Sequence, residues 1–134
     1  MRTYVLDTSG LLAFLEKKPG ALKMNELFKE SLRGRAEILM SVVNYGEAYG
    51  KILREHGSDQ AQATLSLMKP LPITLENITP QRALQAAEVK AMYKLYYMDA
   101  FAAALAMECK GTVVTSDSDF RRLGHGFPIL WLKA

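Results

Sequence analysis

Short apolar runs, spaced along the chain and separated by longer segments with helical spacing, constrain the fold more than any other feature. Continuous apolar runs of this length are typical of strands that are buried on both faces of a parallel sheet. Four runs have this character, and the weaker run 73–75 is a candidate for a further short strand. The four are Thr3–Leu6, Ile38–Val43, Thr112–Thr115 and Ile129–Leu132.

The segments between these runs carry helix start and stop signals. Pro19-Gly20 closes the first helical pattern, Gly34 the second and His56-Gly57 the third, while Thr79 before Pro80 is a capping hydroxyl before a proline. The predicted helices span residues 9–15, 21–32, 44–54, 60–68, 80–94 and 100–109. This alternation predicts an α/β domain with a mostly parallel sheet covered by helices on both faces.

The composition suits one compact domain spanning residues 1–134. Of the 134 residues, 49% are hydrophobic and 23% are charged, so a core can form. We find no linker or internal repeat. The net charge of +3 permits an anionic partner such as nucleic acid without requiring one.

Signals for export, membrane insertion or zinc binding are missing from the sequence. The N-terminal apolar run is short, and no stretch approaches the ~20 apolar residues of a membrane span, so we expect no membrane association. The one cysteine, Cys109, and the widely separated His56 and His125 argue against a zinc site. We expect a soluble protein of the reducing cytoplasm.

Carboxylates follow the apolar runs. Asp7 comes directly after the first run, Glu47 follows the second, and Asp117 and Asp119 follow the third, while Asp99 opens the alanine-rich helix. Sites in open parallel sheets form outside the carboxyl ends of the strands, which meet at one edge. We therefore expect these side chains to converge.

Helix capping is the alternative for each acid. Asp7, Asp99 and Asp117 each stand where a cap is favoured, and Asn44-x-x-Glu47 fits a capping box. For any one residue alone, capping is the commoner role. Convergence of several carboxylates, however, costs energy, since they repel and raise one another's pKa, and a cap does not need it. The joint pattern favours a site.

A hard divalent cation would relieve this repulsion. Mg²⁺ and Mn²⁺ prefer oxygen ligands, and the set contains no histidine or cysteine. Such ions activate water and stabilise the leaving oxygen when phosphodiesters are cleaved. The sequence lacks the glycine-rich motifs that bind nucleoside triphosphates and dinucleotides. We predict a Mg²⁺ or Mn²⁺ site at Asp7, Glu47, Asp99 and Asp117.

These motifs together resemble those of the PIN-domain family, in particular the VapC-type toxins of bacterial and archaeal toxin–antitoxin pairs. The resemblance covers the whole chain. The segments that carry it are residues 5–9 (VLDTS), 41–47 (SVVNYGE), 99–100 (DA) and 115–120 (TSDSDF). The ordered set of four acids is more specific than any one motif.

The resemblance implies a three-layer α/β/α fold and a Mg²⁺- or Mn²⁺-dependent endoribonuclease. It also implies a homodimer inhibited by a small antitoxin. Asp7, Glu47, Asp99 and Asp117 match the acidic positions of the family one by one. Thr115 matches a hydroxyl that supports the site, and Asp119 matches an auxiliary acidic position.

Other functions stay open at this point. They are a non-catalytic RNA-binding or protein-binding module of the same fold, a phosphatase of small phosphoesters and a housekeeping nuclease. Arg121 and Arg122 are candidates for contacts with RNA phosphates, and we expect Trp131 in the core. A partner helix could find a groove at the Leu11-Leu12-Leu15 stretch.

Overall fold

A computed structural model describes residues 1–133 and contains a five-stranded sheet in the order β3-β2-β1-β4-β5. All four neighbouring pairs run parallel. Ala134, the end of the predicted domain, lies outside the described residues. The strands are β1 (Arg2–Leu6), β2 (Ala36–Ser41), β3 (Thr74–Glu76), β4 (Thr112–Thr115) and β5 (Ile129–Trp131). The predicted parallel sheet is confirmed.

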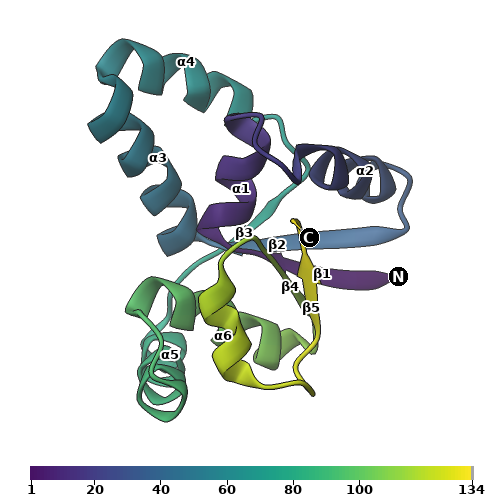
Figure 1. Ribbon diagram of the computed structural model, residues 1–134, viewed down its shortest axis with the longest axis vertical. Coiled ribbons are helices and arrows are strands. Elements are labelled where there is room, and N and C mark those ends of the chain that lie inside the picture. The colour runs from purple at the N-terminus through teal and green to yellow at the C-terminus, as the bar shows by residue number, and fades with distance from the viewer. Residues whose placement is uncertain (134) are drawn as a thin grey trace.

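Helices cover both faces of this sheet (Figure 1). They are α1 (Thr8–Leu15), α2 (Ala21–Leu32), α3 (Val42–His56), α4 (Ser58–Met68), α5 (Pro80–Tyr93), α6 (Tyr97–Cys109) and the 3₁₀ helix η1 (Ser118–Leu123). The first four helices pack on one side, while α5, α6 and η1 pack on the other.

The strands β1, β2, β4 and β5 each contribute to two hydrophobic cores, because successive side chains point to opposite faces of a sheet. In β4, Val114 belongs to the core beneath α1–α4, and Val113 belongs to the core beneath α5 and α6. In β1, Leu6 belongs to the core beneath α1–α4, and Val5 belongs to the core beneath α5 and α6. The continuous apolar runs of the sequence are therefore explained, and the three-layer α/β/α architecture is confirmed.

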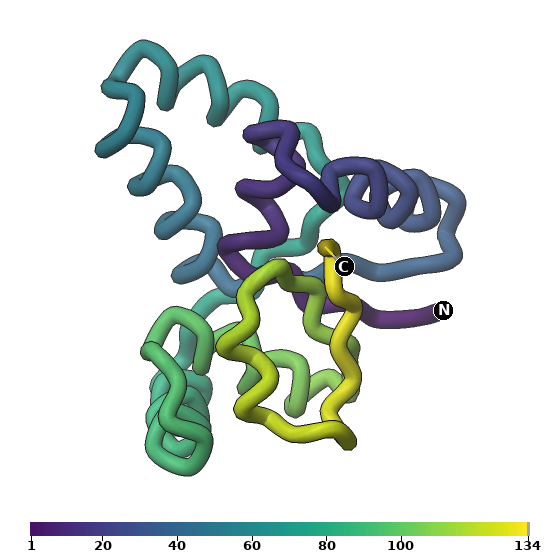
Figure 2. The backbone as a smooth tube through the Cα atoms, in the orientation of Figure 1, coloured from purple at the N-terminus to yellow at the C-terminus, as the bar shows by residue number. Residues whose placement is uncertain are grey.

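The helices α3 and α4 form a pair that extends away from the sheet, as the backbone trace shows (Figure 2). The chain reverses direction between them at Gly57, whose φ is 85°, in the region that favours glycine. Within residues 1–133, the helices are too short or too polar to cross a membrane.

Two predicted helix starts are wrong. The run 38–43 does not stay a strand to its end, because the Ser41 side chain accepts a hydrogen bond from the Val43 N–H and begins α3 at Val42. Asn44 is consequently inside the helix and does not cap it. Likewise, α6 begins at Tyr97, so Asp99 lies in its first turn, beyond the cap position.

Leu11 and Leu12 of the Leu11-Leu12-Leu15 stretch do not line an open groove. Leu11 and Leu12 are 0% and 6% exposed, and Leu15 packs against the same core. Leu11 and Leu12 hold α1 on the sheet and are unavailable to a partner, whereas Leu15 is partly buried and lines an open cavity with Ile52 and Thr64.

Candidate metal and active site

Asp7 lies where β1 ends and α1 begins. Its Oδ1 accepts the Gly10 N–H at 2.7 Å, which makes Asp7 the N-cap of α1. The Thr115 hydroxyl donates to Oδ2, and the Ser9 hydroxyl lies 2.9 Å from both oxygens. With 2% of its surface exposed, Asp7 is a cap and a buried acid at once.

Ser9 and Thr115 join the β1–α1 turn to the end of β4. Their hydroxyl oxygens are 3.1 Å apart. Ser9 accepts the Ser116 N–H at 3.0 Å, and Thr115 accepts the Asp117 N–H at 2.9 Å. The predicted supporting position of Thr115 is thus next to Asp7. Ser9 was not predicted, although its place two residues after Asp7 is the signal that could have revealed it.

Three further acids gather from α6 and from the segment after β4. One carboxylate oxygen from each of Asp99, Asp117 and Asp119 lies within 4.8 Å of the other two. Asp117 is the N-cap of η1 and accepts the Asp119 N–H at 2.9 Å. All three residues are partly buried. The structure therefore places Asp119 with the predicted acids.

Glu47 lies on the next element of the site, helix α3. Its Oε1 accepts the Thr8 hydroxyl at 2.6 Å. The Asn44 amide donates to the Thr8 oxygen at 3.3 Å and to the Met98 carbonyl at 2.9 Å. The capping-box alternative for Glu47 is therefore wrong, because Glu47 reaches across to α1 and does not turn back to its own helix.

Thr8 and Asn44 are site residues that the sequence analysis missed. Asn44 is three residues before Glu47, a spacing that places both on one helix face. Its Oδ1 is buried and has no hydrogen-bond partner among the described residues. The amide nevertheless links α1, α3 and the first turn of α6, next to Asp99.

The pKa values of Asp99 and Asp7 are raised by burial and by repulsion from the neighbouring carboxylates. Burial raises the pKa of Asp99 to about 7, and the charges of Asp117, Asp7, Asp119 and Glu47 add to the rise. Burial also raises the pKa of Asp7 to about 6, against the lowering effect of its hydrogen bonds to Thr115, Gly10 and Ser9. A set of crowded carboxylate oxygens with these pKa values fits a hard divalent cation.

The two arginines of η1 point to different partners. Arg122 lies 3.9 Å from an oxygen of Asp119 and donates to the Lys94 carbonyl at 2.8 Å. The Arg121 guanidinium instead lies over the ring of Trp131, with its carbon 5.6 Å from the ring centroid. Only Arg122 is therefore in contact with the acids.

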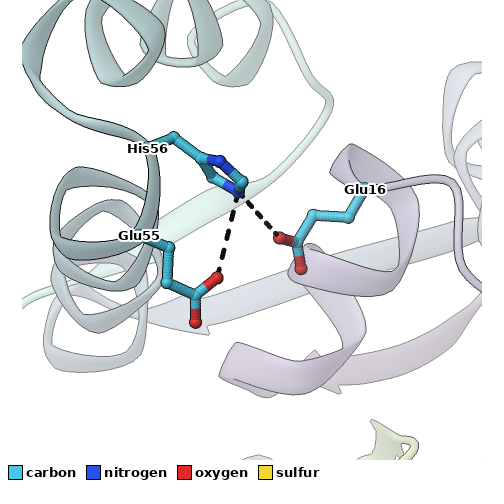
Figure 3. Close-up of side chains that lie close together, drawn as sticks. All are labelled: Glu16, Glu55 and His56. Carbon is cyan, nitrogen blue, oxygen red and sulfur yellow. Dashed lines mark ion pairs between the residues drawn. The ribbon is translucent and has the colours of Figure 1, made fainter.

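A second charged group joins the ends of α1 and α3 (Figure 3). His56 Nε2 lies 3.9 Å from a carboxylate oxygen of Glu16 and equally far from one of Glu55. Lys18 also pairs with Glu16, at 3.1 Å. Exposed pairs of this kind contribute little to stability. We interpret the group as a surface ion-pair network between two helix ends.

The model of the PIN domain matches residues 4–126, and the chain therefore belongs to the PIN-domain family. Solved structures share its fold. VapBC2 from Rickettsia felis, bound to a promoter DNA fragment, is 16% identical with a TM-score of 0.76 over 96% of this chain and 97% of that chain.

DNA-bound VapBC from Salmonella typhimurium is 16% identical, with a TM-score of 0.75 over 98% of this chain and 99% of that one. VapC20 from Mycobacterium tuberculosis, described as a toxin that cleaves the sarcin–ricin loop, is 18% identical, with a TM-score of 0.68 over 90% and 95%. At these identities the likeness concerns the fold. No curated protein sequence matches the chain.

Proposed function

We propose that this chain is a Mg²⁺- or Mn²⁺-dependent endoribonuclease consisting of one PIN domain, residues 1–134. One observation carries the proposal. Acids from four separate elements meet at the carboxyl edge of the sheet in a PIN-domain chain, and two of them have raised pKa values. Helix caps alone would not bring them together.

Each residue of the acidic site has a proposed role. Asp7, Glu47, Asp99 and Asp117 would hold the cation, with Asp119 as an auxiliary acid. A bound cation would supply an activated water and neutralise charge on a phosphate oxygen. Thr115 and Ser9 fix the orientation of the Asp7 carboxylate through their hydroxyls. Thr8 binds one oxygen of Glu47 and leaves the other available.

We further propose that the protein is the toxin of a toxin–antitoxin pair and forms a homodimer in the cytoplasm. The support is the likeness of its fold to proteins solved as VapBC complexes. The acidic site suggests how a partner would inhibit it, since an arginine or lysine of a small antitoxin could pair with Asp99 or Asp117 in place of a cation. The buried leucines of α1 take no part in this binding.

The nuclease proposal is tested with purified protein and a mixed-sequence single-stranded RNA. We expect cleavage with Mg²⁺ or Mn²⁺, none in excess chelator, and none by Asp99→Asn. Asp59→Asn is the matched control, because Asp59 is also a first-turn acid but is exposed on α4. Full cleavage in chelator by the pure protein would contradict the proposal.

The other functions predict different results. A non-catalytic module would bind the RNA and leave it intact with every metal. A phosphatase would hydrolyse a chromogenic phosphate ester and spare RNA. The toxin assignment is tested with the product of the neighbouring gene, which should bind the chain and stop cleavage. If it does neither, a housekeeping nuclease is the better description.

A further inference from the structure

A cavity of about 470 Å³ lies between η1 and β5, and nothing in the proposed function so far uses it. Its lining combines aromatic, aliphatic and cationic side chains, and none of the described residues that line it is acidic. The lining residues are Arg121, Gly124, His125, Phe127, Ile129 and Trp131. Trp131, which we predicted in the core, is therefore a half-buried wall of an open cavity.

Trp131 connects this cavity to the acidic site through the sheet. Trp131 is the register partner of Thr115 in the parallel pair of β4 and β5, so one strand spacing of ~4.8 Å separates their backbones. Thr115 in turn donates its hydroxyl hydrogen to Asp7. On the other wall, η1 carries Asp119 near its start and Arg121 two residues later. The Trp131 end of the cavity is therefore one strand away from the hydroxyl that binds Asp7.

The chemistry of the lining suits a nucleotide. Proteins that bind single-stranded RNA place unstacked bases on aromatic rings and arginine planes. Here the guanidinium of Arg121 already lies over the face of the Trp131 ring, in a cation–π arrangement. Arg121 and His125 are both exposed and can reach a phosphate. The positive charge of Arg121 offsets part of the repulsion between the acidic site and an RNA chain.

We propose that this cavity is a nucleotide subsite, which holds one unstacked base of single-stranded RNA next to the phosphate that is cleaved. The base stacks on Trp131, in the place where Arg121 lies without RNA, and the displaced guanidinium pairs with the phosphate of that nucleotide. This inference rests on the proposed nuclease function, because it assigns the same RNA substrate to the cavity.

The single tryptophan of the chain makes the subsite directly observable, since all tryptophan fluorescence comes from Trp131. We expect AMP and UMP, added in excess chelator so that nothing is cleaved, to quench this fluorescence in a saturable way. Ribose 5-phosphate carries the phosphate without a base. It should bind at least about fivefold more weakly, given the usual contribution of base stacking. Equal quenching by all three compounds would overturn base binding.

Variants test the two side chains with a labelled mixed-sequence RNA 10-mer, again in chelator. Arg121→Ala should weaken binding roughly tenfold and lower the salt-dependence slope by about 1. Arg33→Ala is the matched control, because Arg33 is an exposed arginine at the end of α2. Trp131→Phe should retain most of the affinity and Trp131→Leu should lose it, with thermal unfolding measured for each to establish that it is folded.

The outcomes separate this inference from the nuclease proposal. RNA cleavage by the wild type, with no quenching and equal RNA affinity for Arg121→Ala and Arg33→Ala, would overturn the subsite alone. Nucleotide quenching that depends on Arg121, without metal-dependent cleavage, would support the subsite and overturn the nuclease.

Discussion

Asp7 is both the N-cap of α1 and the most buried acid of the site. Its Oδ1 satisfies a backbone N–H of the helix, while the Thr115 hydroxyl binds its Oδ2. The helix N-terminus also favours a negative charge at this point. A single side chain thereby fixes the start of a helix and presents a carboxylate to the sheet edge.

Asp7→Asn and Asp7→Ala should separate these two roles. Both variants should lose RNA cleavage, because the charge is gone. Asparagine caps helices about as well as aspartate, so Asp7→Asn should fold and, without metal, be at least as stable as the wild type at pH 8. Asp7→Ala should be about 1–2 kcal/mol less stable than Asp7→Asn in urea unfolding. An unfolded Asp7→Asn protein would show that capping needs the charge.

The Thr8 hydroxyl should govern metal binding through Glu47. Thr8→Val removes the hydrogen bond that orients the Glu47 carboxylate, and loss of such outer contacts commonly weakens metal affinity ~10–100-fold. We expect a loss in this range for Mn²⁺, measured by calorimetry. Thr64→Val is the control, since the buried Thr64 hydroxyl bonds to its own helix, at the Gln60 carbonyl. Equal Mn²⁺ affinity in both variants would exclude Thr8 as a positioning residue.

At the scale of elements, the site depends on how closely α1 approaches β1 and β4. Gly10 permits this approach. A Cβ atom at Gly10 would lie 2.5 Å from a Leu6 methyl carbon and 3.0 Å from the Val114 carbonyl oxygen. The same glycine donates its N–H to Asp7, so helix packing and the placement of the acid are coupled.

Gly10→Ala should therefore destabilise the protein by about 1–3 kcal/mol, the usual cost of overpacking a core. Gly50→Ala is the matched change in a helix. A Cβ atom there meets only the flexible end of Arg54, at 3.6 Å, so alanine should stabilise α3 by about 0.5–1 kcal/mol. Urea unfolding of both variants measures the difference. A Gly10→Ala protein as stable as the wild type would show that α1 can shift without cost.

For the whole molecule, charge is unevenly distributed. The chain has a net charge of +3, yet five acids meet at one sheet edge. The folded pKa values of Asp99 and Asp7, about 7 and about 6, lie above the ordinary value of 3.8. Between about pH 4 and pH 7 the folded state thus binds more protons than the unfolded chain, and stability falls as the pH rises.

The metal-free protein should accordingly unfold at a lower temperature at pH 8 than at pH 5. After allowance for solvent screening, we expect a loss of about 1–2 kcal/mol from these two groups. Asp99→Asn should reduce this pH dependence, whereas the exposed control Asp59→Asn should retain it. Mn²⁺ should restore stability at pH 8. These changes are measured by thermal unfolding in chelator between pH 5 and pH 8. If the stability of Asp99→Asn depended on pH as strongly as that of the wild type, Asp99 would not be a source of the pH dependence.

The sequence by itself determined the parallel α/β class and the set of acids. A buried strand in a parallel sheet needs a continuous apolar run, and the edge where strands end is the edge where the next helices begin. Both properties are local, so Asp7, Asp117 and Asp119 could be placed from the runs that precede them. Thr115 and the auxiliary role of Asp119 came from the family resemblance, and the structure brings both residues to the site.

Only the tertiary structure decided the details that depend on distant partners. The strand order, the early start of α3 and the links from Asn44 and Thr8 to Glu47 all involve packing between separate elements. A tryptophan in a strand is expected in the core, and only the position of η1 leaves one side of Trp131 open. Local preferences in a sequence do not encode such contacts, because the energy that selects them comes from burial and hydrogen bonding between residues far apart in the chain.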